Sequence, residues 1–306
     1  MIEGSKRGTT KVKYNSIIGK WKTHCANINC SEVATTTTYA NFLAIEFNRG
    51  LKYSYIRSYN SALKPYIKNV DIDTLQQLLK GIFNVRPPKP KYSAIWDVNP
   101  VLAFLSSMIA KTSKDLTCKL AALLMLLSGN RANTLSHMKI VEGSMILTDT
   151  ECTFIFDENL KHSRPNFRTD PLTFISYPHE PTLCPVKTIW AYMEMRGPLS
   201  DDPHLFITTV KPYRCPKPET ISGWVKTLLG WAGVNTDLYT GHSVRAASTS
   251  AAAKGGVGIM TILKSASWSK VDTFKKYYFK QLEEVYDLEK PNFGSQLLET
   301  YSNKDM

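Results

Sequence analysis

The segment NVRPPKPKYS, residues 84–93, combines three prolines with three positive charges. Proline fixes its own backbone and disfavours a helical conformation in the residue before it, so a segment of this kind ends a helix and forms an extended, semi-rigid connector. We therefore expect a front domain over residues 1–83, a linker over 84–93 and a second domain over 94–280. A chain of 306 residues is long enough for two hydrophobic cores.

The front domain has the pattern of a small helical bundle. Apolar residues recur at helical spacing in YANFLAIEF, residues 39–47, and Gly50 follows as a stop signal. A second helix is predicted over 54–67, and a third over 71–83, capped at its start by Asp71 or Asp73.

The net charge of +12 is unevenly distributed. Residues 1–92 hold 15 Lys and Arg against 5 Asp and Glu, whereas the remaining residues hold 23 against 21. Residues 281–306 form an acidic tail with 2 basic and 6 acidic residues. A basic front domain and linker suit a polyanion such as double-stranded DNA. The alternative is an ordinary solvated cationic surface.

The second domain mixes helices with a few short strands. Apolar and polar residues alternate in three segments with turn signals between them, which is typical of an antiparallel sheet. We therefore expect a fold that is mainly α with a small antiparallel sheet, made of a helical N-terminal domain and an α+β second domain. The predicted strands lie at 144–148, 152–156 and 171–177. The predicted helices lie at 97–110, 114–127, 185–195 and 220–233, and further helices run through residues 240–256 to the end.

Composition also excludes several classes of protein. The longest apolar run, Leu120 to Leu127, is far shorter than a membrane span, and the first residues lack the apolar core of a secretory signal. Six cysteines without a C-x-x-C pair argue against a zinc module and fit a reducing compartment. We expect a soluble intracellular protein. A metal site at His24, Cys25 and Cys30 is the weaker alternative.

Several cations and donors of the second domain lie at predicted turns and helix starts. Arg131 follows a helix break in LLSGNRANTL, and Lys161 occupies a hairpin position in FIFDENLKHSRP. His242 and Arg245 lie one turn apart at the head of the helix in GHSVRAASTSAAA.

The aromatic residues that follow complete a set suited to phosphoryl transfer through tyrosine. Trp268 lies in ASWSK, and Tyr277 and Tyr278 lie in TFKKYYFK. Two arginine forks can hold the oxygens of a phosphate, a lysine can protonate the leaving 5′ oxygen, an imidazole can assist proton transfer and an indole N–H can donate. A tyrosine would be the nucleophile and form a 3′-phosphotyrosine.

A tyrosine nucleophile needs positive charge around it. Tyrosine has a pKa of about 10, so its ionisation at pH 7 costs roughly 4 kcal/mol, and nearby cations lower that cost. The sequence has no carboxylate cluster for Mg²⁺ and no Walker loop. We therefore expect chemistry without a metal, ATP or another cofactor.

These stretches, together with ILKSASWSKVDTFKKYYFK, resemble the tyrosine recombinase (phage-integrase-like) family. The chain is similar above all to recombinases of mobile elements in animal genomes, the DIRS-type and Crypton-type elements, in RPPKPKYSAIWDV, LKHSRP and HS-x-RAASTSAA. The resemblance covers about residues 38–280. It implies a site-specific DNA recombinase or integrase that works as a homotetramer on synapsed DNA, in the nucleus.

The resemblance also implies roles for individual residues. Phosphate contacts are expected from Arg131, Arg245 and Trp268, general-acid catalysis from Lys161, and proton handling from His242. The resemblance thereby implies that His242 and Arg245, one turn apart, face the same phosphate. The acidic tail, residues 281–306, contains FGSQLLETYSN. This segment is expected to form either a helix that docks on a neighbouring subunit or one that packs on its own subunit.

Two positions depart from the family pattern or leave a choice. Many family members carry an acidic residue where this chain has Thr134, which weakens the expected support of Arg131. Adjacent helical residues point about 100° apart, so only one of Tyr277 and Tyr278 can be the nucleophile. The common bacterial spacing favours Tyr277, whereas the animal-element pattern favours Tyr278, which we prefer. Two other functions stay open, a type IB topoisomerase and a domesticated DNA-binding protein without catalysis.

Overall fold

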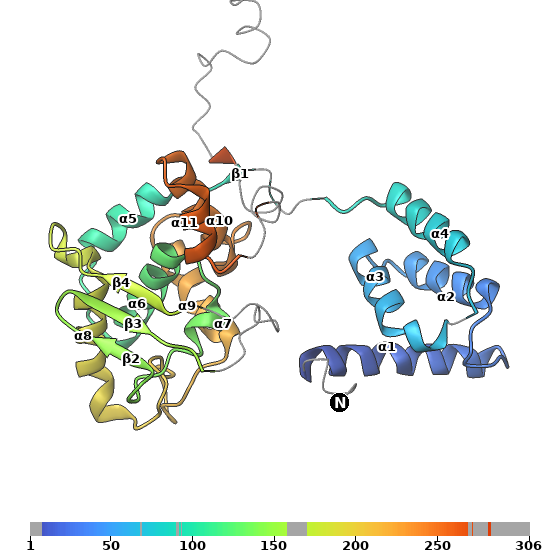
Figure 1. The fold of residues 1–306 in the computed structure, drawn as a ribbon, viewed down its shortest axis with the longest axis horizontal. Helices are drawn as coiled ribbons and strands as arrows, with labels where there is room; N and C mark the ends of the chain where they lie inside the picture. The colour runs from blue at the N-terminus through green and yellow to red at the C-terminus, as the bar shows by residue number, and fades with distance from the viewer. Residues whose placement is uncertain are drawn as a thin grey trace, which may run out of the picture. The chain divides into compact units, whose positions relative to one another are not determined.

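The computed structural model describes residues 8–67, 69–89, 92, 94–157, 170–268, 271 and 281–282. The chain divides into two compact units, unit 1 (Met1–Pro90) and unit 2 (Lys91–Met306), which Figure 1 shows as ribbons. Within these described ranges no helix combines the length and the hydrophobicity that crossing a membrane requires.

Unit 1 is a helical bundle, as the sequence predicts. Helix α3 packs on both α1 and α2, and α2 also packs on α4. The elements are α1 (Gly8–Asn27), α2 (Thr36–Asn48), α3 (Tyr53–Ala62), the 3₁₀ turn η2 (Lys64–Tyr66) and α4 (Ile72–Val85). Helix α4 therefore continues two residues into the segment predicted as a linker.

The first helix, α1, was not expected from the sequence. Its buried residues Ile17, Trp21 and Cys25 recur every four positions and form only a narrow apolar stripe. The helix also contains three Thr, two Asn and two Gly residues, all of which have weak helical preference. Packing of Trp21 into the core, where its indole N–H donates to the Glu32 carbonyl at 3.0 Å, stabilises the helix instead.

The helix starts of unit 1 are capped by side chains. Thr35 and Thr38 form a reciprocal capping box at the start of α2. Of the two candidates for α4, Asp71 is the cap, and its carboxylate accepts from the Thr74 backbone N–H at 2.9 Å. The hydrogen bonds from Thr74 lower the pKa of Asp71 below its usual value.

A buried carboxylate, Glu46, joins three elements of unit 1. It accepts from Arg49 Nη1 at 2.7 Å and from the Tyr59 hydroxyl at 2.9 Å. Lys20 on α1 donates to the same tyrosine oxygen at 3.1 Å, and this hydrogen bond raises the pKa of Lys20. A buried charge is tolerated only with such partners, so this network ties α1, α2 and α3 together.

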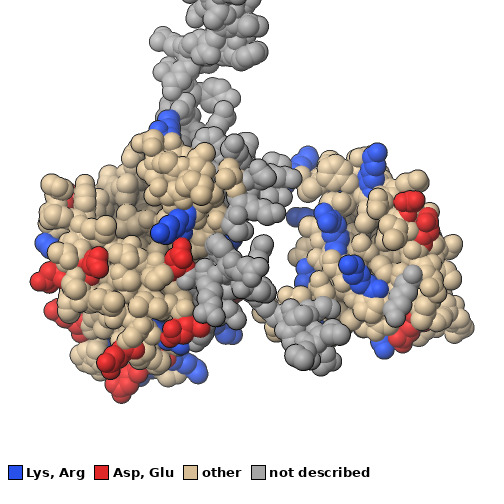
Figure 2. All heavy atoms as spheres, viewed as in Figure 1, with Lys and Arg blue, Asp and Glu red and all other residues tan. Residues whose placement is uncertain are grey.

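The surface of unit 1 is basic, as its composition predicts. Figure 2 shows Lys and Arg side chains spread over the face of unit 1 that is in view. Two cations of α1 lie over aromatic rings of α3, with Lys13 Nζ 5.1 Å from the Tyr55 ring centre and Lys20 Nζ 5.8 Å from that of Tyr59. Lysine side chains are thus held along the α1–α3 side of the bundle.

Unit 2 is an α+β unit with a three-stranded antiparallel sheet, which confirms the predicted fold class. The strand order is β2-β3-β4, and β1 and β5 form a separate two-residue parallel pair. The strands are β1 (Ala94–Ile95), β2 (Met145–Leu147), β3 (Glu151–Phe154), β4 (Leu172–Ile175) and β5 (Gln281–Leu282). The helices are α5 (Val98–Ser107), α6 (Ser113–Ser128), α7 (Ala132–Leu135), α8 (Pro185–Arg196), α9 (Pro218–Trp231), α10 (Val244–Lys254) and α11 (Ile259–Ser265), with the 3₁₀ turns η3 (Pro181–Leu183), η4 (Gly197–Leu199) and η5 (Gly241–Ser243).

Helix α6 is the central element of unit 2. It packs against α8, α9 and α10, and nearly every residue from Thr117 to Leu126 is buried. Such a helix is apolar all round, which explains the long apolar run in the sequence. A capping box of Thr112 and Asp115 begins the helix, and the left-handed Gly129 ends it.

We expect Glu46→Gln to lower the free energy of unfolding of unit 1 by about 1–3 kcal/mol, because the amide is uncharged and has one acceptor oxygen where the buried carboxylate uses two, for Arg49 and Tyr59. The matched control is Glu32→Gln. Glu32 pairs with Lys22 at 3.2 Å, but both side chains are about half exposed, 46% and 49%. An exposed pair of this kind contributes at most about 1 kcal/mol. Scanning calorimetry of the full chain measures both, and equal losses would contradict the network.

Candidate active site

The loop that ends α6 carries the first predicted site residue. Gly129 has a φ of 62°, so the chain leaves the helix in the left-handed conformation that favours glycine. Asn130 follows, and Arg131 is the N-cap residue of the short helix α7. The Arg131 side chain is half-buried. The sequence therefore predicts correctly that a helix break precedes Arg131.

Arg245 lies beneath this loop. It is in the first turn of α10, and its side chain is 0% exposed. Nη1 donates to the Gly129 carbonyl at 2.7 Å, which joins segments 116 residues apart. This close approach needs glycine, because a Cβ on Gly129 would lie 2.9 Å from Thr249 Cγ2 and 3.4 Å from Ala266 Cβ.

Trp268 covers the other side of the Arg245 guanidinium. The Cζ atom of Arg245 lies 4.1 Å from the centre of the Trp268 ring, a stacked cation–π geometry. The Trp268 backbone N–H donates to the Leu263 carbonyl at 2.8 Å, so its side chain packs on the end of α11. A cation–π contact away from water contributes about 2 kcal/mol or more. The structure thus brings Arg245 and Trp268 together.

His242 lies at the surface just before Arg245. It belongs to the turn η5, and its side chain is exposed. Gly241 approaches α9 so closely that a Cβ would lie 2.4 Å from the Ser222 carbonyl oxygen. On the other side of His242, the Ser243 hydroxyl accepts from Trp96 Nε1 at 2.9 Å. The backbone around His242 is therefore fixed from both sides.

His242 and Arg245 differ in exposure, which sequence spacing does not predict. They are one turn apart, as expected, but the imidazole is exposed and the guanidinium is buried. The expectation that both face one phosphate stays a prediction. The burial arises because the Gly129 loop and the Trp268 turn cover Arg245.

Three predicted site residues, Lys161, Tyr277 and Tyr278, lie outside the described residues. The roles assigned to them stay predictions. Thr134, the departure from the family pattern, is buried, and its hydroxyl lies 3.5 Å from Asn130 Oδ1.

Several residues that shape this site were not predicted. Asn130 is buried, and its Nδ2 donates to the Ser265 carbonyl at 2.7 Å. Ser265 and Ser267 lie in the turn that carries Trp268, and Gly129 and Gly241 allow the close approaches described above. The one signal in the sequence is the polar pair Asn130-Arg131 directly after an apolar helix.

An open pocket lies beside this loop. Its volume is about 290 Å³, and Lys264 is the cation among its described lining residues. Its lining comes from the α6–α7 loop, from α7, from α11 and the turn after it, and from residues at or near the ends of β3 and β4. The lining residues are Asn130, Thr134, Phe156, Asp170, Pro171, Leu172, Thr173, Thr261, Lys264, Ser265 and Ser267.

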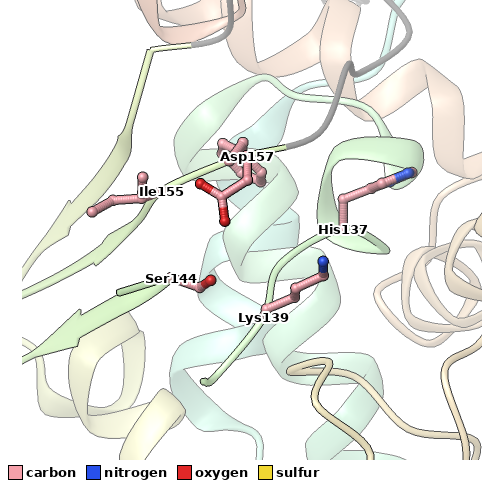
Figure 3. Close-up of a pocket in the computed structure, with 6 residues that line it drawn as sticks. His137, Lys139, Ser144, Ile155 and Asp157 are labelled. Atoms are coloured by element: carbon pink, nitrogen blue, oxygen red, sulfur yellow. The ribbon is translucent and has the colours of Figure 1, made fainter. Parts of the chain in front are cut away.

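A second hollow, between α7 and the sheet, contains none of the predicted site residues. Figure 3 shows Lys139 and Asp157 on its rim, with Ser144 nearby. Its volume is about 10 Å³, which is room for about one water molecule. It is too small for a substrate.

The described residues contain no group of three His, Cys, Asp or Glu side chains arranged to hold a metal. For His24 and Cys25, two of the three residues in the alternative metal site with Cys30, the structure shows other roles. His24 packs on Trp21 and Phe42, with ring centres 5.8 and 5.0 Å away. Burial raises the pKa of the Cys25 thiol to about 12, which keeps it protonated.

The fold is similar to that of several integrases and site-specific recombinases. The Tn1549 transposon integrase in complex with transposon right end DNA aligns with a TM-score of 0.62 and 12% identity, over 98% of this chain and 95% of that chain. The XerH site-specific recombinase bound to difH substrate aligns with a TM-score of 0.57 and 11% identity, over 85% of this chain and 72% of that chain. A lambda integrase dimer bound to a COC′ core site aligns with a TM-score of 0.54 and 14% identity, over 94% of each chain.

These similarities show that the chain has the tyrosine recombinase fold. No protein-family model matches the sequence, and a search of curated proteins finds no match. The fold is therefore established by structure alone, at sequence identities between 11% and 14% for these three proteins.

We expect Gly129→Ala to destabilise unit 2 by about 2 kcal/mol or more, because the new methyl group adds crowding to the strain of a positive φ. The control is Gly143→Ala. Gly143 also has a positive φ, 77°, but a Cβ there would have no atom within 4 Å. Urea unfolding of the two variants separates crowding from backbone strain. Equal destabilisation would contradict close packing of this loop on α10.

Proposed function

We propose that the chain is a site-specific DNA recombinase that cleaves and rejoins double-stranded DNA through a 3′-phosphotyrosine intermediate. The observation that carries the proposal is the arrangement of Arg245 between Trp268 and the Gly129 carbonyl, two residues before Arg131 in the chain, in a tyrosine recombinase fold. Arginine in such fixed surroundings is suited to hold the oxygens of a phosphate.

The chemistry assigns one role to each residue. The hydroxyl oxygen of Tyr278, or of Tyr277, attacks the phosphorus, and the P–O5′ bond breaks as the P–O(Tyr) bond forms. Lys161 gives its proton to the leaving 5′ oxygen, and His242 accepts the proton that the tyrosine hydroxyl loses. Arg131 and Arg245 stabilise the charge on the non-bridging oxygens. Attack of a 5′ hydroxyl on the phosphotyrosine reverses these steps and rejoins the strand.

The fixed orientation of the Arg245 guanidinium supports this mechanism. A guanidinium that is already oriented does not need to be reorganised when negative charge develops on the phosphate. Arg245 is held by a hydrogen bond and by an aromatic ring, and the Arg131 backbone is fixed as the N-cap residue of α7. The exposed His242 is accessible to a substrate that reaches this face.

The basic unit 1 supports DNA as the substrate. Its Lys and Arg surplus would neutralise phosphates of the backbone, whereas the reactive residues belong to unit 2. The sequence motifs support a role on the ends of a mobile element, in the nucleus. Assembly as a homotetramer on two synapsed sites is part of the same proposal.

The test is a nicked suicide substrate, from which the strand fragment diffuses away after cleavage, incubated with the full chain in the presence of EDTA. We expect a covalent protein–DNA adduct on a denaturing gel, and peptide mapping places it on Tyr278. Tyr278→Phe should abolish the adduct and Tyr277→Phe should leave it, and the reverse result would assign the nucleophile to Tyr277. Tight DNA binding without an adduct would overturn the proposal and favour a non-catalytic DNA-binding protein.

We expect Arg131→Ala to reduce the rate of adduct formation about 100-fold or more, because one charged donor to the phosphate is lost. Arg131 is half-buried, so its removal leaves the core intact. Arg214→Ala is the control, since Arg214 is an exposed arginine of the same unit. Equal rates for the two variants would exclude Arg131 from the site.

A further inference from the structure

We propose that Asn130 is a positioning residue for the reaction site, because its carboxamide joins the loop that carries Arg131 to the turn that carries Trp268. This inference rests on the proposed recombinase function. It concerns a residue that acts through its neighbours and need not touch the DNA.

The strongest contact of Asn130 crosses between the two segments. Nδ2 donates to the Ser265 carbonyl at 2.7 Å, and the Ser265 hydroxyl donates back to the Ser128 carbonyl at 3.0 Å. Two hydrogen bonds in opposite directions therefore connect the end of α6 to the end of α11. Asn130 is only 1% exposed, so water does not compete for its amide.

The other end of the same carboxamide receives two hydroxyl groups. Ser267 Oγ lies 3.4 Å and Thr134 Oγ1 lies 3.5 Å from Asn130 Oδ1, which makes these the weaker contacts. Ser267 has a φ of 52°, a left-handed conformation that is unfavourable for serine. The contacts with Asn130 help to hold the turn in this shape.

Together with the contacts of Arg245, these contacts form a closed ring of interactions between the α6–α7 loop, α10 and the turn after α11. Gly129, directly before Asn130, accepts from Arg245, and Arg245 stacks on Trp268, directly after Ser267. The hydrogen bonds of Asn130 join the turn back to the loop and complete this ring. Rotation of the loop would therefore move Arg131 relative to Arg245, and the Asn130 amide resists that rotation.

A neutral amide suits this position. A carboxamide donates to the Ser265 carbonyl and accepts from the Ser267 and Thr134 hydroxyls at the same time, which a carboxylate cannot do. The Asn130 amide fixes the loop through hydrogen bonds and adds no negative charge. Thr134 contributes a neutral hydroxyl to the same cluster.

The test is the variant Asn130→Asp, which keeps the shape of the side chain and removes the donor to the Ser265 carbonyl. Asn133→Asp is the matched control, because it adds the same charge three residues away, and the described part of the chain shows no hydrogen bond to the Asn133 side chain. Asn130→Leu provides a second variant without charge. Single-turnover cleavage of the suicide substrate is measured at saturating protein, together with DNA affinity and the unfolding midpoint.

We expect the rate constant of Asn130→Asp and Asn130→Leu to fall about 100-fold, since a small misplacement of catalytic groups has effects of that size. DNA affinity should stay within about threefold of the unsubstituted chain. A merely structural role would lower the amplitude of cleavage, through loss of folded protein, and would leave the rate constant of the folded fraction unchanged. A 5′-bridging phosphorothiolate, whose sulfur leaves without a proton, should not restore the rate, because the defect lies in holding the phosphate.

Two results separate the possible failures. In the first, the unsubstituted chain forms an adduct, and both Asn130 variants have the same rate constant as Asn133→Asp. This result overturns the positioning role and leaves the recombinase function standing. Absence of any adduct with the unsubstituted chain overturns the function, and the positioning role with it.

Discussion

The guanidinium of Arg245 is a buried positive charge, and the local structure of unit 2 is arranged around it. Burial of an ion is costly unless polar or aromatic groups compensate for lost water. Here the Gly129 carbonyl and the Trp268 ring supply that compensation from two segments remote in sequence. The end of α6 must therefore be a glycine in the left-handed conformation, and the chain after α11 must turn back over α10.

This constraint connects stability to function. An arginine held on two sides keeps a single orientation, and a phosphate-binding group is effective when its orientation is set before the substrate arrives. The same packing fixes the loop that leads to Arg131, while η5 presents His242 at the surface. The hydrogen bonds of Asn130 link the two arginine segments through the turn before Trp268.

Much of the secondary structure follows from local patterns. The apolar run in α6 and a cap for α4 at Asp71 or Asp73 were readable in the sequence, because helix period and capping depend on residues within one or two turns. Alternation likewise predicted the three strands of the sheet. Helix α1 was missed because its apolar stripe is narrow and its composition favours other structures, so only packing of Trp21 in the core makes it a stable helix.

The candidate site was likewise predictable from the sequence only in part. The residue types themselves predicted a chemistry of cations and tyrosine, because phosphoryl transfer without a metal needs such groups. Burial of Arg245 under Trp268, exposure of His242 and the bridge through Asn130 depend on tertiary structure. Arg245 and Gly129 are 116 positions apart, and Asn130 and Ser265 are 135 apart. No local periodicity encodes such contacts, because they form only when α6, α10 and α11 pack together. The sequence by itself therefore determined which cationic and aromatic groups this unit contains, and tertiary packing decided how Arg245 and its neighbours are held.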